Sequence, residues 1–173
     1  MPTTPITLAA INSLGRDEFV AALGPLFEGS PWIAAETWSS RPFASRDALH
    51  RALCATMYAA PTERKLALIR AHPDLAGKAA IAGELTAESA REQSSAGLNR
   101  LSPEEFATFT RLNQAYGEKF GFPFVICVRE HTKDTILESF SARLQHQRDQ
   151  EVETALGEIA KIARLRLLDA VRD

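Results

Sequence analysis

The sequence predicts an all-α fold, a single-domain multi-helix bundle with one short extended segment at about residues 121–128. Apolar residues recur at the spacing of one helix face along most of the chain. Capping residues precede several of these runs, and glycine or proline stands near their ends. A length of 173 residues with 45% hydrophobic side chains can form one core, so residues 1–173 are expected to be one domain.

Three helices are expected in the first third of the chain. Residues 16–27 carry apolar side chains at helical spacing. Ser30 followed by Pro31 is typical of an N-cap with proline at the first helical position, so a short helix should follow. Ser45 is placed to cap the next helix. The expected apolar positions are Phe19, Leu23, Trp32, Trp38, Leu49, Leu53 and Met57.

Residues 63–69 are expected to form a helix that is capped by Thr62 and ends before His72. Pro73 disfavours helical backbone at the residue before it, so His72 should lie on a short extended link with its ring available to a cleft. Histidine titrates near neutral pH, so this position suits a proton-transfer group. An ordinary loop is the commoner explanation of such a step, and the residues alone leave both open.

The helix expected around residue 90 carries a polar face. Ser89, Glu92, Gln93 and Ala96 are separated by three and four residues, so they share one side of the helix. If that side is buried, its polar groups need partners. A solvent-exposed face is the commoner explanation, because charged residues are mostly exposed, and a functional role for Glu92 is the alternative.

The clearest helix start in the chain lies at Ser102, where a capping box with Glu105 coincides with Pro103 at the first helical position. Gly121 is expected to end this helix. Residues 121–128, which follow, are rich in aromatic and β-branched side chains, so they should be extended and buried. The backbone groups of a lone segment need partners. Either they bind a ligand, or the segment is a buried helix start or a wrongly assigned strand.

Two further helices complete the expected fold. Thr132 should cap the first, and the second should run from about Glu151 to Val171 with an apolar stripe. Arg166 lies in this last helix between two leucines. It is either exposed, like its neighbour Arg164, or buried at the edge of the core, where it would pair with an anion.

Composition and charge exclude several classes of function. A net charge of −2 and a pI of about 6.1 predict no attraction to nucleic acid or to a membrane surface. No apolar run approaches the ~20 residues that span a bilayer, and no signal peptide is evident, so a cytoplasmic location is expected. Cys54 and Cys127 lie in apolar runs, which predicts two buried thiols and no metal site.

Three ordered motifs together resemble the family of OHCU decarboxylase, that is 2-oxo-4-hydroxy-4-carboxy-5-ureidoimidazoline decarboxylase, the last enzyme from urate to (S)-allantoin. The similarity covers almost the whole chain. It implies an all-helical fold, a homodimer, and no metal or organic cofactor. The motifs are His72-Pro73-Asp74-Leu75-Ala76-Gly77-Lys78, Ser89-x-x-Glu92-Gln93-x-x-Ala96-Gly97-Leu98 and Phe120-Gly121-Phe122-Pro123-Phe124-Val125-Ile126.

The resemblance also implies the residues of an active site for a small-molecule ureidoimidazoline substrate. His72 matches the catalytic histidine of the family, and Glu92 matches the catalytic acid. One departure is visible, since the family often has asparagine shortly after the Arg143-Leu144 pair, where this chain has His146. We expect that departure to affect a helix turn rather than the chemistry. The positions that match substrate contacts are Pro73, Ser89, Gln93, Phe124, Ile126 and Arg166.

The chemistry that the resemblance implies is decarboxylation by general acid–base catalysis, because the substrate's own C=N bond can accept the electrons that CO2 leaves behind. His72 is expected to take the hydroxyl proton, and Glu92 to orient His72 or return a proton. A related step on another ureide or purine-breakdown compound is the nearest alternative. A helical binding module without catalysis is the other, although neither a basic recognition helix nor an exposed apolar groove is evident in the sequence.

Overall fold

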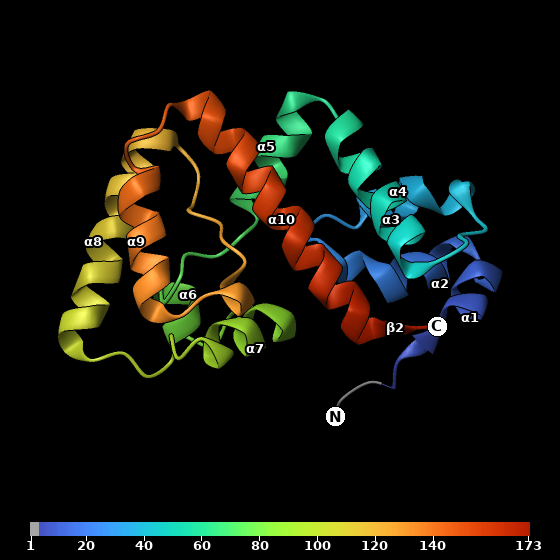
Figure 1. The fold of residues 1–173 in the computed structure, drawn as a ribbon, viewed down its shortest axis with the longest axis horizontal. Coiled ribbons are helices and arrows are strands. Elements are labelled where there is room, and N and C mark those ends of the chain that lie inside the picture. Colours follow the sequence, from blue (N-terminus) through green and yellow to red (C-terminus); the bar gives the residue numbers. More distant parts are fainter. Residues whose placement is uncertain (1–3) are drawn as a thin grey trace. The chain divides into compact units, whose positions relative to one another are not determined.

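The computed structural model describes residues 4–173, and it is helical nearly throughout, which confirms the predicted all-α class (Figure 1). Residues 1–3 of the predicted domain lie outside the described part. The contacts within the chain divide it into two compact units. The first unit consists of the residues up to Ala71 together with Ala160–Asp173, and the second consists of His72–Ile159.

The first unit is built from short helices and the last turns of helix α10. In this unit α3 packs against both α2 and α4. Two short strands pair in parallel, with Ile6 opposite Val171. These strands were not predicted from the sequence, because two residues are too few to show a periodic pattern. The elements are β1 (Ile6–Thr7), α1 (Leu8–Ser13), α2 (Arg16–Leu23), α3 (Trp32–Thr37), α4 (Arg46–Ala59), α5 (Thr62–Arg70) and β2 (Val171–Arg172), while α10 spans Arg148–Ala170.

The helix starts of the first unit agree with the predictions to within a residue or two. The Ser45 side chain accepts a 3.0 Å hydrogen bond from the Ala48 amide, which confirms it as the cap of α4. Helix α3 begins one residue later than predicted, after Pro31, and Thr62 is the first residue of α5 rather than its cap. Helix α2 ends early, and a 3-10 turn follows, because Pro25 has no amide hydrogen to continue the helix.

The second unit surrounds a cluster of aromatic side chains. Figure 1 shows helices α8 and α9 running side by side, and residue contacts join them. The rings of Phe124 and Phe140 stack with centroids 3.8 Å apart, and the Tyr116 ring meets the Phe124 ring edge-on at 5.4 Å. The elements are α6 (Lys78–Ile81), α7 (Ala87–Ser95), α8 (Pro103–Phe120), a 3-10 turn at Val128–Glu130, α9 (Lys133–Arg143) and the first turns of α10.

Local capping explains where the two long helices of the second unit begin and end. The Ser102 hydroxyl accepts from the Glu105 amide, and the Glu105 carboxylate accepts from the Ser102 amide, so the predicted capping box is confirmed. Gly121 ends α8 in the left-handed region with φ of 78°, a conformation that glycine adopts without strain. Thr132 caps α9 as predicted.

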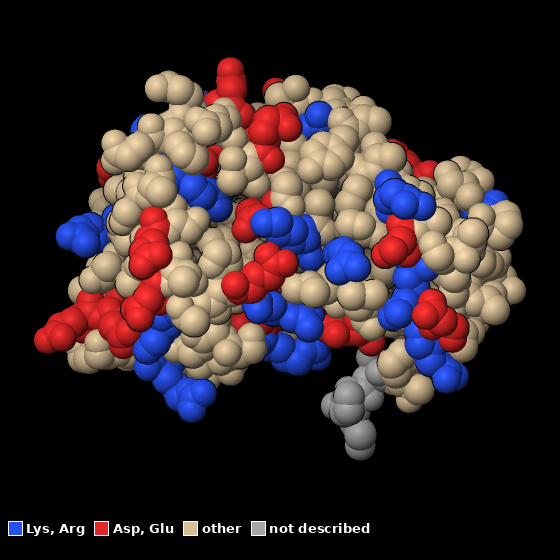
Figure 2. Space-filling model, viewed as in Figure 1, with Lys and Arg blue, Asp and Glu red and all other residues tan. Residues whose placement is uncertain are grey.

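Two properties of the described residues bear on membranes and charged partners. None of the helices between residues 4 and 173 combines the length and the apolar character needed to cross a bilayer. On the face drawn in Figure 2, acidic and basic side chains are interspersed, and neither sign dominates a large area.

Candidate functional site

His72 lies just beyond the end of helix α5, outside any helix, as Pro73 predicts. Its side chain is not exposed like that of a typical surface loop, since only 8% of the residue is accessible. A buried histidine in a non-helical link needs structure around it to hold the ring in place. That structure comes from the loop that follows.

The loop after His72 is held by side chains from two helices. The Gln93 side-chain oxygen accepts a 2.9 Å hydrogen bond from the Ala76 amide, and its nitrogen donates to the Asp74 carbonyl at 3.4 Å. From α8, the Asn113 side chain donates to the Leu75 carbonyl at 2.9 Å. The first motif is thus fastened to the helix that carries the second motif.

The loop also depends on one unusual backbone conformation and on one crowded position. Ala76 has φ of 52°, in the left-handed region that side-chain-bearing residues seldom adopt. At Gly77, an added Cβ atom would lie 2.8 Å from Cβ of Asp74, so only glycine fits without displacing the loop. The turn that follows His72 is therefore specified by the packing of these residues.

Helix α7 turns its polar face inward. Ser89 and Gln93 are both buried, and Glu92 is half-buried. The solvent-exposed alternative for this face is therefore wrong. Thr86 caps α7 by accepting from the Ser89 amide, so the helix start next to Ser89 is well defined. Gln93 uses its oxygen and one amide hydrogen on the loop, which leaves its second amide hydrogen for another acceptor.

Helix α7 also lies against the end of the segment that contains Phe124 to Ile126. It packs on the 3-10 turn at Val128–Glu130. Burial raises the pKa of the Cys127 thiol, and together with the negative charges of Glu130, Glu158 and Glu92 it brings that pKa from 9.0 to about 11. Glu92 lies on the helix that packs on this turn, so the second motif lies beside the residues that follow the third.

Residues 123–127 lie outside helix and strand, and residues 124–127 are buried, with Phe124 and Ile126 at 1% and 4% exposure. The predicted burial is confirmed for residues 124–127, and the helix-start alternative is wrong there, but no strand forms and Val128 already belongs to the 3-10 turn. Its backbone partners are side chains. The Val125 carbonyl accepts a 2.8 Å hydrogen bond from Nη1 of Arg143, and the Cys127 amide donates to Glu158 at 3.4 Å.

Not all of the backbone donors of this segment are used within the protein. The amides of Val125 and Ile126 donate no hydrogen bond to any residue in the described part of the chain. Buried amides are normally paired. The prediction that backbone amides of this segment bind a ligand therefore stands, and these two unpaired amides are the reason for it.

Arg166 is buried in the first unit, so the exposed alternative is wrong. Its Nη2 atom lies 3.0 Å from Oε1 of Glu28, and its Nη1 donates to the Pro25 carbonyl at 3.0 Å. Both side chains of the ion pair are about 5% exposed. A buried Arg166 was predicted to pair with an anion, and within this unit that anion is the carboxylate of Glu28.

The predicted site residues therefore divide between the two units. All but Arg166 belong to the second unit, where the Gln93 hydrogen bonds join the first motif to the second and helix α7 packs on the turn that follows the third. The residues of the second unit are His72, Pro73, Ser89, Glu92, Gln93, Phe124 and Ile126.

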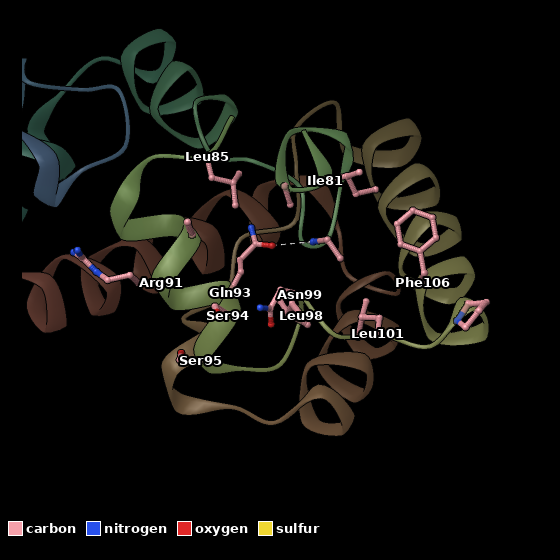
Figure 3. Close-up of a pocket in the computed structure, with 14 residues that line it drawn as sticks. Ile81, Leu85, Arg91, Gln93, Ser94, Ser95, Leu98, Asn99, Leu101 and Phe106 are labelled. Atoms are coloured by element: carbon pink, nitrogen blue, oxygen red, sulfur yellow. Dashed lines mark hydrogen bonds between the residues drawn. The ribbon is translucent and has the colours of Figure 1, made fainter. Parts of the chain in front are cut away.

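An apolar groove of about 1160 Å³ lies elsewhere on the second unit, beside helices α6 and α7 and the start of α8 (Figure 3). Ile81, which is 68% exposed, and Phe106 are among its lining residues, and Gln93 is the member it shares with the predicted site. The residue patterns did not indicate this groove. Arg91 is its titratable lining residue, so the groove offers no acid–base group suited to neutral pH.

Several polar residues that hold the site in place were not predicted from the sequence. Asn113 fastens the loop after His72, and Glu151 and Glu158 lie buried on α10. A signal was present for the two glutamates, because they share helical spacing with the buried Ala155 on the apolar stripe. Between residues 4 and 173, histidine, cysteine and acidic side chains form no cluster of three that could hold a metal ion.

Comparisons with known proteins give consistent matches along the chain. The model of the OHCU decarboxylase family matches residues 12–168. The 2-oxo-4-hydroxy-4-carboxy-5-ureidoimidazoline decarboxylase of Halalkalicoccus jeotgali is 43% identical over 164 residues, which cover 95% of this chain and 91% of that protein.

Two solved structures are also similar. A crystal structure of (S)-allantoin synthase has a TM-score of 0.76 and 30% identity, over 97% of this chain and 54% of that one. A crystal structure of OHCU decarboxylase in the presence of (S)-allantoin has a TM-score of 0.66 and 25% identity, over 88% of this chain and 96% of that one.

Proposed function

The chain belongs to the OHCU decarboxylase family, and we propose that it converts OHCU to (S)-allantoin by acid–base catalysis at His72 and Glu92. The chain is a decarboxylase, as its family and its named relatives are. The observation that carries the mechanism is the fastening of the buried His72 link to helix α7, which bears Glu92, through the hydrogen bonds of Gln93.

The substrate can supply its own electron sink. OHCU has a carboxylate and a hydroxyl group on one ring carbon, next to a ring C=N bond. When the bond to CO2 breaks, its electron pair forms a C=C bond in the ring, and the C=N pair moves to nitrogen, which takes a proton. The hydroxyl then loses its proton to form the carbonyl, and the C=C pair takes a proton at the carbon that bears the ureido group.

In this scheme the protein positions the substrate and moves protons. His72 takes or shares the hydroxyl proton, and Glu92 orients His72 or returns a proton. Delivery of the final proton to one face of the ring sets the (S) configuration. Holding the reacting groups in line contributes to the rate because orientation is fixed before the reaction begins. No metal or organic cofactor takes part in the proposed steps.

The remaining residues of the site bind the substrate. Ser89 and the free amide hydrogen of Gln93 offer hydrogen bonds from α7, and Pro73 shapes the link beside His72. The segment at Phe124 and Ile126 offers backbone amides to the ring. Arg166 suits planar recognition of the ureido and carbonyl groups. We also propose that the protein forms a homodimer, as the resemblance implies.

The test is a coupled assay that begins with urate. Urate oxidase and hydroxyisourate hydrolase generate fresh OHCU, this protein is added, and circular dichroism follows the allantoin that forms. The proposal predicts an (S)-allantoin signal that appears faster than OHCU decays by itself, without an added metal or cofactor. If the folded protein leaves OHCU to decay at its spontaneous rate to a racemic product, the proposal is wrong. A different ureide as substrate would then be the better explanation.

A further inference from the structure

A buried ion pair lies behind the segment that contains Val125. Nε of Arg143, in α9, is 2.8 Å from Oε1 of Glu151, in α10, and the side chains are 6% and 0% exposed. Removing two charges from water is costly, and apolar residues of similar size often stabilise a fold equally well. Stability alone therefore does not account for this pair.

The arginine of the pair is directed at the segment. Nη1 of Arg143 donates to the Val125 carbonyl at 2.8 Å, and Cζ lies 4.3 Å from the ring centroid of Phe124. Its Nη2 atom is buried and has no hydrogen-bond partner among the described residues. The guanidinium thus forgoes one hydrogen bond while it contacts two successive residues of the segment.

The glutamate of the pair is held from two further places. Oε1 of Glu151 accepts a 2.6 Å hydrogen bond from the Tyr116 hydroxyl of α8, and Oε2 lies 2.9 Å from Nδ1 of His146. Burial and the Glu151 carboxylate raise the pKa of Tyr116 well above its usual value, so its hydroxyl stays a donor. Glu151 is therefore a fixed anchor for Arg143.

Fixing the Val125 carbonyl also fixes the Ile126 amide. The two groups belong to one planar peptide unit, in which the C=O and the N–H point in opposite directions. Arg143 holds the carbonyl on one side. The Ile126 amide is therefore directed to the other side, and it donates to no residue in the described part of the chain.

We propose that Arg143 is a positioning residue for decarboxylation, because with Glu151 it holds the Val125–Ile126 peptide so that the Ile126 amide faces the substrate ring. This inference rests on the proposed function. It assigns a role to a residue that does not itself touch the substrate. It also explains why the charges of Arg143 and Glu151 are buried, which the packing of the second unit does not explain.

The first test uses the wild-type protein and (S)-allantoin as the probe. In ¹⁵N-labelled protein, the Ile126 amide resonance should shift as (S)-allantoin is added. If other resonances of the second unit shift and that of Ile126 does not, the inference is wrong. This measurement needs no variant, so it can overturn the inference even if changes at Arg143 prevent folding.

The second test uses two variants. Arg143→Lys keeps a positive charge beside Glu151, but a single ammonium group cannot reproduce the planar fork that reaches both Glu151 and Val125. The double variant Arg143→Met/Glu151→Leu removes both buried charges together, so that neither is left unpaired, although the Tyr116 hydroxyl loses its acceptor. In both, kcat/KM for enzymatically generated OHCU should fall roughly 10- to 100-fold, because a small displacement of a substrate contact is costly to the rate.

A matched control removes an arginine–glutamate pair that is far more exposed. Arg64→Met/Glu36→Leu makes the same chemical change between α5 and α3, and kcat/KM should stay at the wild-type value. If a folded Arg143 variant also keeps wild-type kcat/KM, and wild type accelerates OHCU decay, the inference fails alone. If wild type does not accelerate OHCU decay, the proposed function fails as well.

Discussion

The side-chain oxygen of Gln93 accepts a 2.9 Å hydrogen bond from the backbone amide of Ala76, and this bond joins helix α7 to the loop that follows His72. Figure 3 shows the Gln93 side chain directed at the loop, with the hydrogen bond drawn. Gln93 therefore has a structural task in addition to the substrate contact proposed for it. Its position couples the placement of the histidine to that of Glu92, one residue earlier on the same helix.

Replacing Gln93 by leucine should destabilise the protein. The Ala76 amide would lose its acceptor in a buried place, which costs about 1–3 kcal/mol of unfolding free energy. Urea denaturation measures this loss. The control is Gln114→Leu at an exposed position of α8, where little change is expected. Equal unfolding free energies for wild type and Gln93→Leu would show that the bond does not hold the loop.

Changing Glu92 to glutamine tests the charge at nearly constant shape. If Glu92 orients His72 or returns a proton, kcat should fall roughly 10²- to 10⁴-fold, the usual size of general acid–base contributions. The change should also lower the pKa of the Cys127 thiol, because one of the negative charges that raise it is gone. Glu84→Gln, in the exposed turn before α7, serves as the control. Wild-type turnover by Glu92→Gln would remove Glu92 from the mechanism.

The buried pair of Arg166 and Glu28 predicts an asymmetric effect on stability. Glu28→Leu leaves the arginine charge buried without its carboxylate, and the unfolding free energy should fall by about 3–5 kcal/mol. Glu36→Leu breaks an exposed pair with Arg64 and should cost at most about 1 kcal/mol. Chemical denaturation of both variants makes the comparison. Losses of similar size would mean that the Glu28 pair contributes no more than a surface pair.

The two cysteines predict a loss of stability at alkaline pH. Burial raises the pKa of Cys54 and of Cys127 from 9.0 to about 11. An acid whose pKa is higher in the folded state stabilises the fold below its unfolded pKa. That contribution is therefore present below pH 9 and is lost as the pH rises towards about 11. Unfolding free energies measured across this range should fall less steeply in Cys54→Ala and Cys127→Ala. Slopes identical to wild type would contradict the prediction.

The helix starts could be predicted from the sequence because their signals are local. The caps at Ser45 and Ser102 each depend on residues within three positions along the chain. The non-helical position of His72 follows from Pro73 in the same way. The two-residue strands and the four-residue helix α6 are too short to produce a periodic pattern, so they were missed.

Contacts between distant residues could not be predicted from periodicity. Arg166 and Glu28 are 138 positions apart, and no local pattern relates them. The pattern did place Ser89, Glu92 and Gln93 on one face of a helix, but burial of that face depends on what packs against it. The resemblance supplied the candidate roles of these residues, and the structure adds that Gln93 joins the first motif to helix α7, which packs on the turn that follows the third motif.

His72 is proposed to take the hydroxyl proton during OHCU decarboxylation, and a comparison of two proteins tests this role. Wild type and His72→Asn are added separately to freshly generated OHCU, and circular dichroism records the formation of (S)-allantoin. We expect rapid formation with wild type and a rate close to spontaneous decay with the variant, while far-ultraviolet spectra show equal helicity. If folded His72→Asn forms (S)-allantoin as fast as wild type, the claim is contradicted.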